Sequence, residues 1–386
     1  MYAKRVAAVG PPEHVPTPPA ARAPDATGRL VLPGFIDARA PVQVHAEGAE
    51  AYHRDAAYMA ERGLIVGIDG GGTRTRCLAI GAAGHFGAWG ESGPLMGLYA
   101  GQDAAEGALA EALGRCVAGL PRGAGPIQRA GISVPICDRE RLSAVVGSHA
   151  PDAVLYWIEG EALACLAAAT EAERGLVILS GTGSFADAVD ADAVVGHAGG
   201  FGPLLGDDGS GYAISVAALR AAVRASQGRG GPTALADAAR EHFDVGDLWG
   251  LVERLYGERL PREQIAAFAP AVMRMSENGD SVAADIVRRA ADELADMAQA
   301  AATQAGWWGE SFPTVLCGGV LDGSETLRRK VTDRLGEVLP GARPIPSRFA
   351  PVVGAALLAL GPRPATEPAM IANLEATLPD ACKAGR

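Results

Sequence analysis

The chain has 386 residues, of which 48% are hydrophobic and 20% are charged, a composition typical of globular domains rather than of disordered segments. Its formal net charge of −11 argues against nucleic acid or an anionic membrane as the main partner. An acidic protein can still bind phosphate through backbone amides and a bound cation. No run approaches the roughly 20 apolar residues that span a bilayer, and the start "MYAKRVAAVGPP" lacks the apolar segment of a signal peptide.

The six cysteines stand at positions 77, 116, 137, 165, 317 and 382 and form no CxxC pair. This spacing predicts buried thiols in a reducing compartment, rather than a disulfide framework or a zinc site. Cys77, Cys165 and Cys317 lie in apolar runs, so we expect them in the core. We therefore expect a cytoplasmic protein.

Residues 1–62 differ from the rest of the chain. The segment "PPEHVPTPPAARAPDATG" is rich in proline and predicts irregular structure. Residues 28–45, "GRLVLPGFIDARAPVQVH", resemble the opening of metal-dependent amidohydrolases, in which a strand after "PGFID" supplies two metal-binding histidines. Arg39 and Pro41 stand at those two positions. We expect an extension without an intact metal site.

An α/β pattern begins at residue 63. The runs "LIVGID" and "RCLAIGAAG" predict two strands around a glycine turn, and "GAWGES" predicts a third. A helix is expected over 103–120, with Asp103 as its N-cap. The runs "AGISV" and "AVLYWIE", separated by the helical stretch "DRERLSAVVGSH", predict further strands. Strands that alternate with helices favour buried parallel strands, and we assign residues 63–172 to a first domain.

The segment 175–196, "GLVILSGTGSFADAVDADAVVG", repeats the opening plan of strand, small-residue turn and strand. We interpret it as an internal duplication, with a second domain over 173–347. Helical patterns follow at 212–227, 232–243, 261–277 and 281–306, and then the strand "TVLCGG" and a helix over 325–338. Residues 348–362 predict a C-terminal helix that packs back on the first domain. Residues 363–386 are expected to be a tail.

Two turns, one in each half, are candidates for phosphate binding. The chain has neither the GxxxxGK[ST] motif of a P-loop nor a GxGxxG that opens a helix. In Asp69-Gly70-Gly71-Gly72-Thr73, missing side chains let backbone amides converge on an anion, Thr73 adds a hydroxyl, and Asp69 can orient hydrated Mg²⁺. Ser180-Gly181-Thr182-Gly183-Ser184 offers the same chemistry. Either turn alone is equally well explained as a structural hairpin, but the pair predicts a clamp on a polyphosphate.

Five motifs occur in the order "GIDGGGT", "LSGTGS", "GGFGPLLGDDGSGY", "LCGGVLDGS" and "APVVGAALLAL". This order resembles the N-acetylglucosamine kinase branch of the BadF/BadG/BcrA/BcrD-type ATPase family, within the actin–hexokinase–Hsp70 superfamily. The match extends over residues 63–362, and "GDDGSGY" with its preceding "GGFG" is the most specific element. The resemblance implies an α/β fold of two ribonuclease-H-like domains, with an interdomain cleft that closes over ATP-Mg²⁺ and a sugar.

The resemblance also implies roles for residues of the nucleotide site. Asp69 would orient the magnesium ion, and Thr73 and Thr182 would contact the phosphates. The adenosine would lie against three small residues, which admit a flat base but are equally compatible with a plain packing role: Ala267, Gly319 and Gly323.

On the acceptor side, the turn 200–202 resembles the family's sugar-binding Gly-Trp-Gly. The phenylalanine keeps a face that can stack on a pyranose ring but lacks the indole N–H. Asp207 matches a carboxylate that accepts hydrogen bonds from sugar hydroxyls. Asp208 is expected to be solvated and Ser210 to cap the following helix. The implied sugar contacts are therefore Gly200, Phe201, Gly202 and Asp207.

Phosphoryl transfer needs a base near the accepting hydroxyl, and the family uses an aspartate at a strand end. The matching residue is Glu161, 21 residues before Thr182. A glutamate has the right pKa class but one extra methylene, and a misplacement of ~1 Å can cost about a hundredfold in rate. Glu159, expected on the strand's other side, is the second choice. Met96 stands near the family's sugar-contacting asparagine, so the acceptor half departs from the pattern twice.

The leading hypothesis is an ATP-dependent kinase that phosphorylates a hydroxyl of an amino sugar or related small carbohydrate, with ATP and Mg²⁺ as cofactors. Its partner would be that small molecule, not a nucleic acid or a membrane, and a homodimer stays open. The alternative is a non-catalytic, nucleotide-dependent sugar sensor or regulatory ATPase subunit, which the Asp-to-Glu change and the lost asparagine suggest. A third reading, an ATPase that drives reductive chemistry through an iron–sulfur cluster, is opposed by the scattered cysteines.

Overall fold

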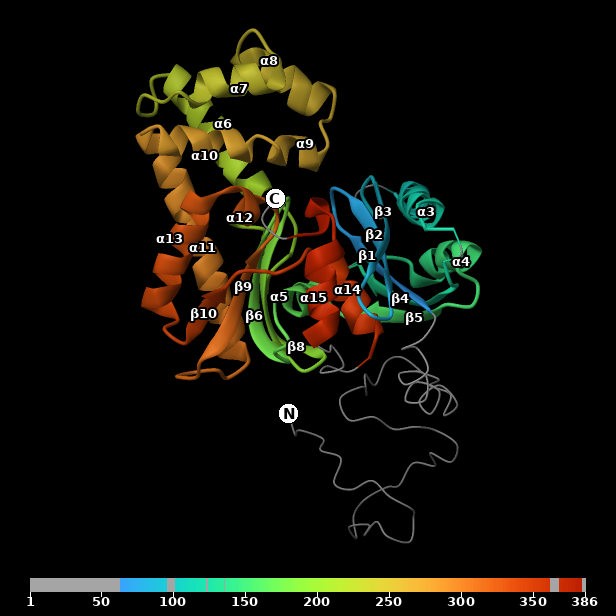
Figure 1. The fold of residues 1–386 in the computed structure, drawn as a ribbon. Helices are drawn as coiled ribbons and strands as arrows, with labels where there is room; N and C mark the ends of the chain where they lie inside the picture. Colours follow the sequence, from blue (N-terminus) through green and yellow to red (C-terminus); the bar gives the residue numbers. More distant parts are fainter. Residues whose placement is uncertain (1–62, 96–100, 123, 135, 362–367, 384–386) are drawn as a thin grey trace, which may run out of the picture. The chain divides into compact units, whose positions relative to one another are not determined.

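The computed structural model describes residues 63–95, 101–122, 124–134, 136–361 and 368–383 (Figure 1). The extension 1–62 and Met96 lie outside these residues, so the expectations for them remain predictions. The described residues form two five-stranded mixed sheets with helices packed on them.

The first sheet has the strand order β3-β2-β1-β4-β5. The first three strands form an antiparallel meander, and β4 and β5 run parallel to β1. Its helices α3 (Gln102–Ala118) and α4 (Arg139–His149) pack on one face. The strands are β1 (Leu64–Gly70), β2 (Thr75–Gly81), β3 (Phe86–Ser92), β4 (Ile127–Ser133) and β5 (Val154–Ile158).

The second sheet repeats this topology, with the order β10-β9-β6-β7-β8. Its first three strands are again an antiparallel meander, and β9 and β10 run parallel to β6. The duplication predicted from the sequence is therefore confirmed, although β10 was not anticipated. The strands are β6 (Arg174–Ser180), β7 (Ser184–Asp190), β8 (Ala193–Gly199), β9 (Phe312–Cys317) and β10 (Ala342–Ile345).

The second half also carries most of the helices. The long helix α11 (Ser281–Gln304) covers one face of the sheet together with α6 (Gly211–Ser226) and α13 (Glu325–Val338). Figure 1 shows a further group of helices gathered beside one end of α6. These are α7 (Leu235–Phe243), α8 (Leu248–Val252) followed by a π-helical turn, α9 (Arg262–Ala266) and α10 (Ala269–Glu277).

The helix expected over 261–277 is in fact two helices, α9 and α10, and this prediction was wrong about its continuity. Pro270 stands in the first turn of α10. A proline inside a helix lacks the backbone donor, and its ring clashes with the carbonyl group four residues earlier, which here is that of Ala266. The break exposes Ala267 at the junction.

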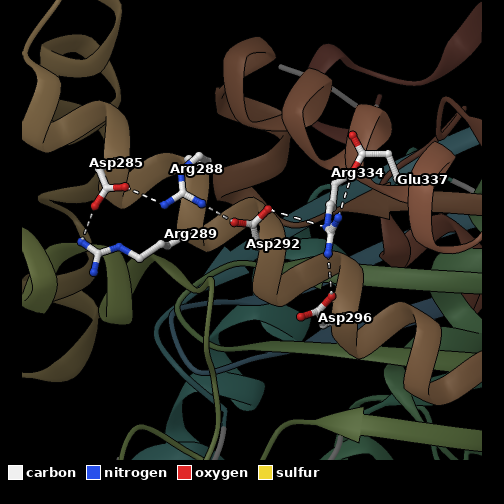
Figure 2. Close-up of polar contacts among 7 residues, drawn as sticks. All are labelled: Asp285, Arg288, Arg289, Asp292, Asp296, Arg334 and Glu337. Carbon is white, nitrogen blue, oxygen red and sulfur yellow. Dashed lines mark hydrogen bonds and ion pairs between the residues drawn. The ribbon is translucent and has the colours of Figure 1, made fainter.

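Exposed ion pairs connect α11 to α13 on the outer surface (Figure 2). Arg334 of α13 pairs with Asp292 and Asp296 of α11, and Arg288 bridges Asp285 and Asp292 within α11. Exposed pairs of this kind contribute roughly 0–1 kcal/mol each. The two helices are therefore held mainly by their buried aliphatic residues, among them Val331 and Leu335.

Helix α14 (Pro351–Ala359) is buried between α5 (Glu161–Ala169) and the first sheet. Its close approach depends on glycines, because a Cβ at Gly354 would lie 1.9 Å from the carbonyl oxygen of Ala164. A Cβ at Gly67 of β1 would likewise lie 2.1 Å from the Val352 carbonyl oxygen, and one at Gly131 of β4 would lie 2.0 Å from that of Ala355. Backbone-to-backbone packing thus fixes α14 on the first sheet.

Two further details differ from the sequence predictions. The segment expected as a tail contains the helix α15 (Pro368–Thr377), which buries Met370 and Leu374 in the cluster around α14. Helix α3 begins after Gly101 rather than after Asp103, which lies inside the helix and pairs with Arg141 of α4. The buried thiols of Cys77, Cys165 and Cys317 agree with the prediction of a core role.

Candidate functional site at the two glycine turns

The two glycine turns meet in the structure. Thr73 follows β1, Thr182 follows β6, and their hydroxyl oxygens lie 2.7 Å apart. Because β1 and β6 are equivalent strands of the two sheets, each turn occupies the same place in its half. The structure therefore brings together the two turns that the sequence singles out, as a clamp requires.

The first turn is shaped by contact with Leu95. Leu95 donates its backbone N–H to the carbonyl of Gly71, and a Cβ at Gly70 would lie 2.2 Å from Leu95 Cδ2. Gly71 faces open space, and its N–H donates to the carbonyl of Arg74. Only glycine fits at position 70, whereas position 71 leaves room for a ligand.

Asp69 lies at the end of β1, beside this turn. Burial raises the pKa of its carboxyl to about 6, although nearby Arg76 lowers it. Such a carboxylate lacks sufficient positive charge around it, and a divalent cation would supply that charge. Mg²⁺ is commonly bound by one or two carboxylates together with substrate phosphates. Within the described ranges no group of three or more His, Cys, Asp and Glu side chains could hold a metal ion.

The second turn is fastened to the start of α6. Gly181 accepts a hydrogen bond from the backbone N–H of Gly211, and the Ser180 hydroxyl donates to the carbonyl of Gly209. The Ser184 hydroxyl donates to the carbonyl of Asp208. As predicted, Asp208 is exposed, and Ser210 caps α6 by accepting from the backbone N–H of Ala213. The motif "GDDGSGY" is thus the backbone support of the second turn.

Three elements meet around Gly181 and Gly211. A Cβ at Gly211, the first residue of α6, would lie 3.2 Å from the Gly181 carbonyl oxygen and 3.4 Å from that of Ala266 at the end of α9. The backbone nitrogen of Gly319, where α12 (Gly319–Gly323) begins, lies 4.0 Å from the Cβ position of Gly181. The small residues predicted to hold adenosine, at 267, 319 and 323, are all exposed. Gly319 adjoins the second turn, and Ala267 follows Ala266, whose carbonyl group lies near Gly211.

The acceptor turn 200–202 also joins the second turn. Its backbone is left-handed at both glycines, with φ of 73° at Gly200 and 83° at Gly202. The N–H of Gly200 donates to the carbonyl of Ser184 at 2.8 Å. Phe201 is 67% exposed, so its ring is available for stacking on a ligand.

Asp207 is more constrained than the sequence suggests. It is buried, has a left-handed backbone with φ of 68°, and its Oδ2 lies 2.5 Å from Nη2 of Arg262. The backbone N–H groups of Ser184 and Gly202 also donate to this carboxylate. Burial raises the pKa of Asp207, whereas Arg262 and the two backbone donors lower it. Arg262 was missed by the sequence analysis, because nothing in its local sequence links it to residue 207.

Glu161 is the first residue of α5, after a left-handed Gly160 with φ of 118°. The pKa of its carboxyl is raised to about 8, chiefly by burial and then by the charges of Asp69 and Asp187. Glu161 and Asp69 thus belong to a group of acidic side chains whose charges interact. Glu159, the second choice, lies outside this group and pairs with Arg139 at 2.7 Å on the surface.

One further pair near the acceptor turn was not anticipated. Asp187 of β7 and His197 of β8 face each other across the strands, with His197 Nδ1 2.6 Å from Asp187 Oδ1. This hydrogen bond raises the pKa of the imidazole. The His197 ring lies 6.0 Å from that of Phe201, centroid to centroid. Alternation along two strands could have indicated a shared face, but only pairing register identifies the partners.

Comparison with known proteins agrees with this geometry. The chain is 28% identical over 312 residues to the N-acetyl-D-glucosamine kinase of Dictyostelium discoideum, which covers 77% of this chain and 98% of that protein. It is 29% identical over 137 residues to the N-acetylmuramic acid/N-acetylglucosamine kinase of Clostridium acetobutylicum, over 36% of this chain and 45% of that one. In the part of the chain that the structure describes, none of the helices has the length and apolarity needed to cross a membrane.

A solved structure from Chromobacterium violaceum, assigned as an N-acetylglucosamine kinase, matches with a TM-score of 0.59 and 25% identity. The match covers 78% of this chain and 99% of that chain. The two sheets of equal topology are the fold of actin/hexokinase-type ATPases. The sequence model of the BadF/BadG/BcrA/BcrD ATPase family matches residues 66–359. The chain therefore belongs to the BadF/BadG/BcrA/BcrD ATPase family.

Proposed function

We propose that this protein is an ATP-dependent kinase that phosphorylates a hydroxyl group of an amino sugar of the N-acetylglucosamine class. The observation that carries the proposal is the 2.7 Å contact between the hydroxyls of Thr73 and Thr182, which joins the two glycine turns beside Asp69 and Glu161. The names of the relatives from Dictyostelium discoideum and Clostridium acetobutylicum support the reaction and the class of acceptor.

In this proposal the phosphates of ATP lie between the two turns, where Thr73 and Thr182 donate hydroxyl hydrogen bonds. The adenosine extends toward Ala267 and Gly319, because Gly319 lies beside Gly181 and Ala266, which precedes Ala267, lies beside Gly211. Asp69 would hold the magnesium ion, which when bound offsets the negative charge of the phosphates. The backbone amides of the turns add fixed positive dipoles that cost no reorganisation during the reaction.

The acceptor sugar would stack on Phe201 and reach the carboxyl of Glu161 with one hydroxyl. The proton of that hydroxyl passes to the Glu161 carboxylate while the oxygen forms a bond to the γ-phosphorus of ATP. The bond from that phosphorus to the bridging oxygen breaks, and ADP leaves. The products are a sugar phosphate and ADP, and the proton on Glu161 is afterwards released to water.

The test uses purified protein with ATP-Mg²⁺ and a panel of N-acetylglucosamine, N-acetylmannosamine, glucosamine and N-acetylmuramic acid. We expect at least one sugar to accelerate ADP formation and to yield a phosphosugar by mass spectrometry. Nucleotide binding with sugar-induced stabilisation but no phosphosugar would favour the sensor alternative. ADP formation that no member of the panel accelerates would contradict the proposal.

The proposal includes a cytoplasmic location, which the free cysteines support because unpaired thiols persist in a reducing compartment. Fractionation of the source cells with an antibody to the protein would test this part separately. Recovery in an extracellular fraction would contradict it.

A further inference from the structure

Arg262 connects the phosphate turn to the acceptor carboxylate. It begins α9, and its Nη2 lies 2.5 Å from Oδ2 of Asp207 and 3.4 Å from the carbonyl oxygen of Thr182. The side chains of Arg262 and Asp207 are only 16% and 5% exposed. Its guanidinium carbon also lies 5.8 Å from the ring centroid of Tyr212. A mostly buried cation is therefore held on the second glycine turn.

Gly183 leaves the space that this ion pair fills. A Cβ at position 183 would lie 3.0 Å from Nη2 of Arg262, and 3.1 and 3.2 Å from the two carboxylate oxygens of Asp207. The guanidinium group and the carboxylate thus both pack on the peptide that follows Thr182. A phosphate held by the Thr182 hydroxyl would lie next to this cation.

An arginine is well suited to contact that phosphate. Its guanidinium group is always charged and offers paired donors that match phosphate oxygens. The arginines that flank the first turn, Arg74 and Arg76, both pair with Glu91, at 3.5 and 3.3 Å. Arg262 instead pairs with a residue of the acceptor side. Whatever draws Arg262 away from Asp207 therefore changes the acceptor side as well.

We propose that Arg262 is a ligand of the transferring phosphate, and that it exchanges Asp207 for this phosphate when the nucleotide binds. Asp207 is buried and its backbone is fixed in a left-handed turn with φ of 68°, so its carboxylate stays in place when the guanidinium leaves. The vacated carboxylate oxygen then accepts a hydrogen bond from an acceptor hydroxyl. This second half of the inference rests on the proposed function, whereas the phosphate contact does not.

The exchange makes nucleotide and acceptor binding mutually favourable, because each ligand weakens the same ion pair. Thermodynamic linkage requires both affinities to change by the same factor. A purely structural role would differ in a measurable way. If Arg262 only tethered α9 to the second turn, its loss would displace Ala267 and would weaken the binding of adenosine as much as the binding of ATP.

The first experiment measures nucleotide binding alone, by calorimetry with the non-hydrolysable analogue AMP-PNP-Mg²⁺ and with adenosine. For Arg262→Gln we expect about tenfold or more weaker AMP-PNP binding and adenosine binding within about twofold of wild type. Arg262→Lys keeps the charge without the paired donors and should lie between. Arg288→Gln, which breaks an exposed ion pair on α11, is the matched control. Equal losses for both ligands, or no loss for AMP-PNP, would overturn the phosphate contact.

The second experiment measures the dissociation constants of N-acetylglucosamine and of N-acetylmuramic acid. Each is measured without nucleotide, with ADP-Mg²⁺ plus inorganic phosphate, and with AMP-PNP-Mg²⁺. In wild type we expect AMP-PNP to tighten acceptor binding about tenfold, and in Arg262→Gln we expect a ratio near one. A wild-type ratio near one, or an unchanged ratio in the variant, would overturn the exchange even if the protein is a kinase. If the wild-type protein neither binds nor phosphorylates any sugar of the panel, both the proposed function and the exchange are contradicted. The first experiment still decides whether Arg262 contacts the phosphate.

Discussion

The hydroxyl oxygens of Thr73 and Thr182 lie 2.7 Å apart, although 109 residues separate them in the chain. Each follows the first strand of its sheet, so equivalent points of the two halves are in contact. A phosphate that accepts a hydrogen bond from both hydroxyls would replace the contact between them, so the two hydroxyls must move apart to admit it.

Removal of either hydroxyl should weaken ATP binding. For Thr73→Ala and Thr182→Ala we expect the KM for ATP to rise about tenfold or more, because a hydrogen bond to a charged group contributes roughly 1.5–3 kcal/mol. The matched variants Thr73→Ser and Thr182→Ser keep the hydroxyl and should stay within about threefold of wild type. Steady-state kinetics at saturating sugar would measure both. Alanine variants with an unchanged KM would contradict the clamp.

Loss of the carboxylate at Glu161 should slow turnover strongly without weakening nucleotide binding. For Glu161→Gln we expect kcat to fall about 10²–10⁴-fold, the contribution usual for a positioned base, with ADP-Mg²⁺ affinity within about threefold of wild type. Glu159→Gln is the control, since Glu159 forms an exposed ion pair with Arg139. Similar activity in the two variants would assign the base to another residue.

The same carboxyl predicts how stability depends on pH. The pKa of Glu161 rises from 4.5 to about 8 on folding, so between these values the folded state binds more protons than the unfolded state. Stability should therefore fall as the pH rises from about 4.5 to about 8. Glu161→Gln lacks this titration, so its melting temperature should exceed that of wild type above pH 8. Thermal melts without ligand from pH 5.5 to 9 measure the difference, and parallel curves for the two proteins would contradict it.

Gly354 should tolerate no side chain. In Gly354→Ala the new Cβ would lie 1.9 Å from the carbonyl oxygen of Ala164, so α14 and α5 must separate. We expect a loss of about 1–3 kcal/mol or more. Gly336→Ala in α13 is the control, because its Cβ would meet nothing within 4 Å and alanine favours helix by up to about 1 kcal/mol. Chemical denaturation measures both variants, and equal stabilities would contradict the packing argument.

Substitution of Phe201 should weaken binding of the acceptor sugar without lowering the stability of the fold. Because its side chain is 67% exposed, Phe201→Ala should leave the melting temperature within about 2 °C of wild type. The KM for the sugar should rise about fivefold or more, through loss of the stacking face, and Phe201→Trp should restore or lower it. An unchanged KM in the alanine variant would remove Phe201 from the acceptor site.

Much of the fold could be predicted from local pattern. The strands around "LIVGID" and "GLVILS", the helix at 325–338 and the duplicated turns follow from apolar runs and glycine placement, which act over a few residues. The break before Pro270 was also encoded locally and was overlooked. The short strand β10 has one arginine and one proline among its four residues, so its sequence is a weak strand signal. Only its pairing with β9 identifies it as a strand.

The sequence by itself determined the two-half architecture and which two glycine turns are candidates for phosphate binding, because strand periodicity and glycine runs are properties of neighbouring residues. Only the tertiary structure decided which distant side chains meet. The 2.7 Å contact of Thr73 with Thr182, the ion pair of Asp207 with Arg262 and the pair of Asp187 with His197 each depend on how separate elements pack. Such contacts are set by burial and register across the whole fold, and these leave no mark in the local sequence.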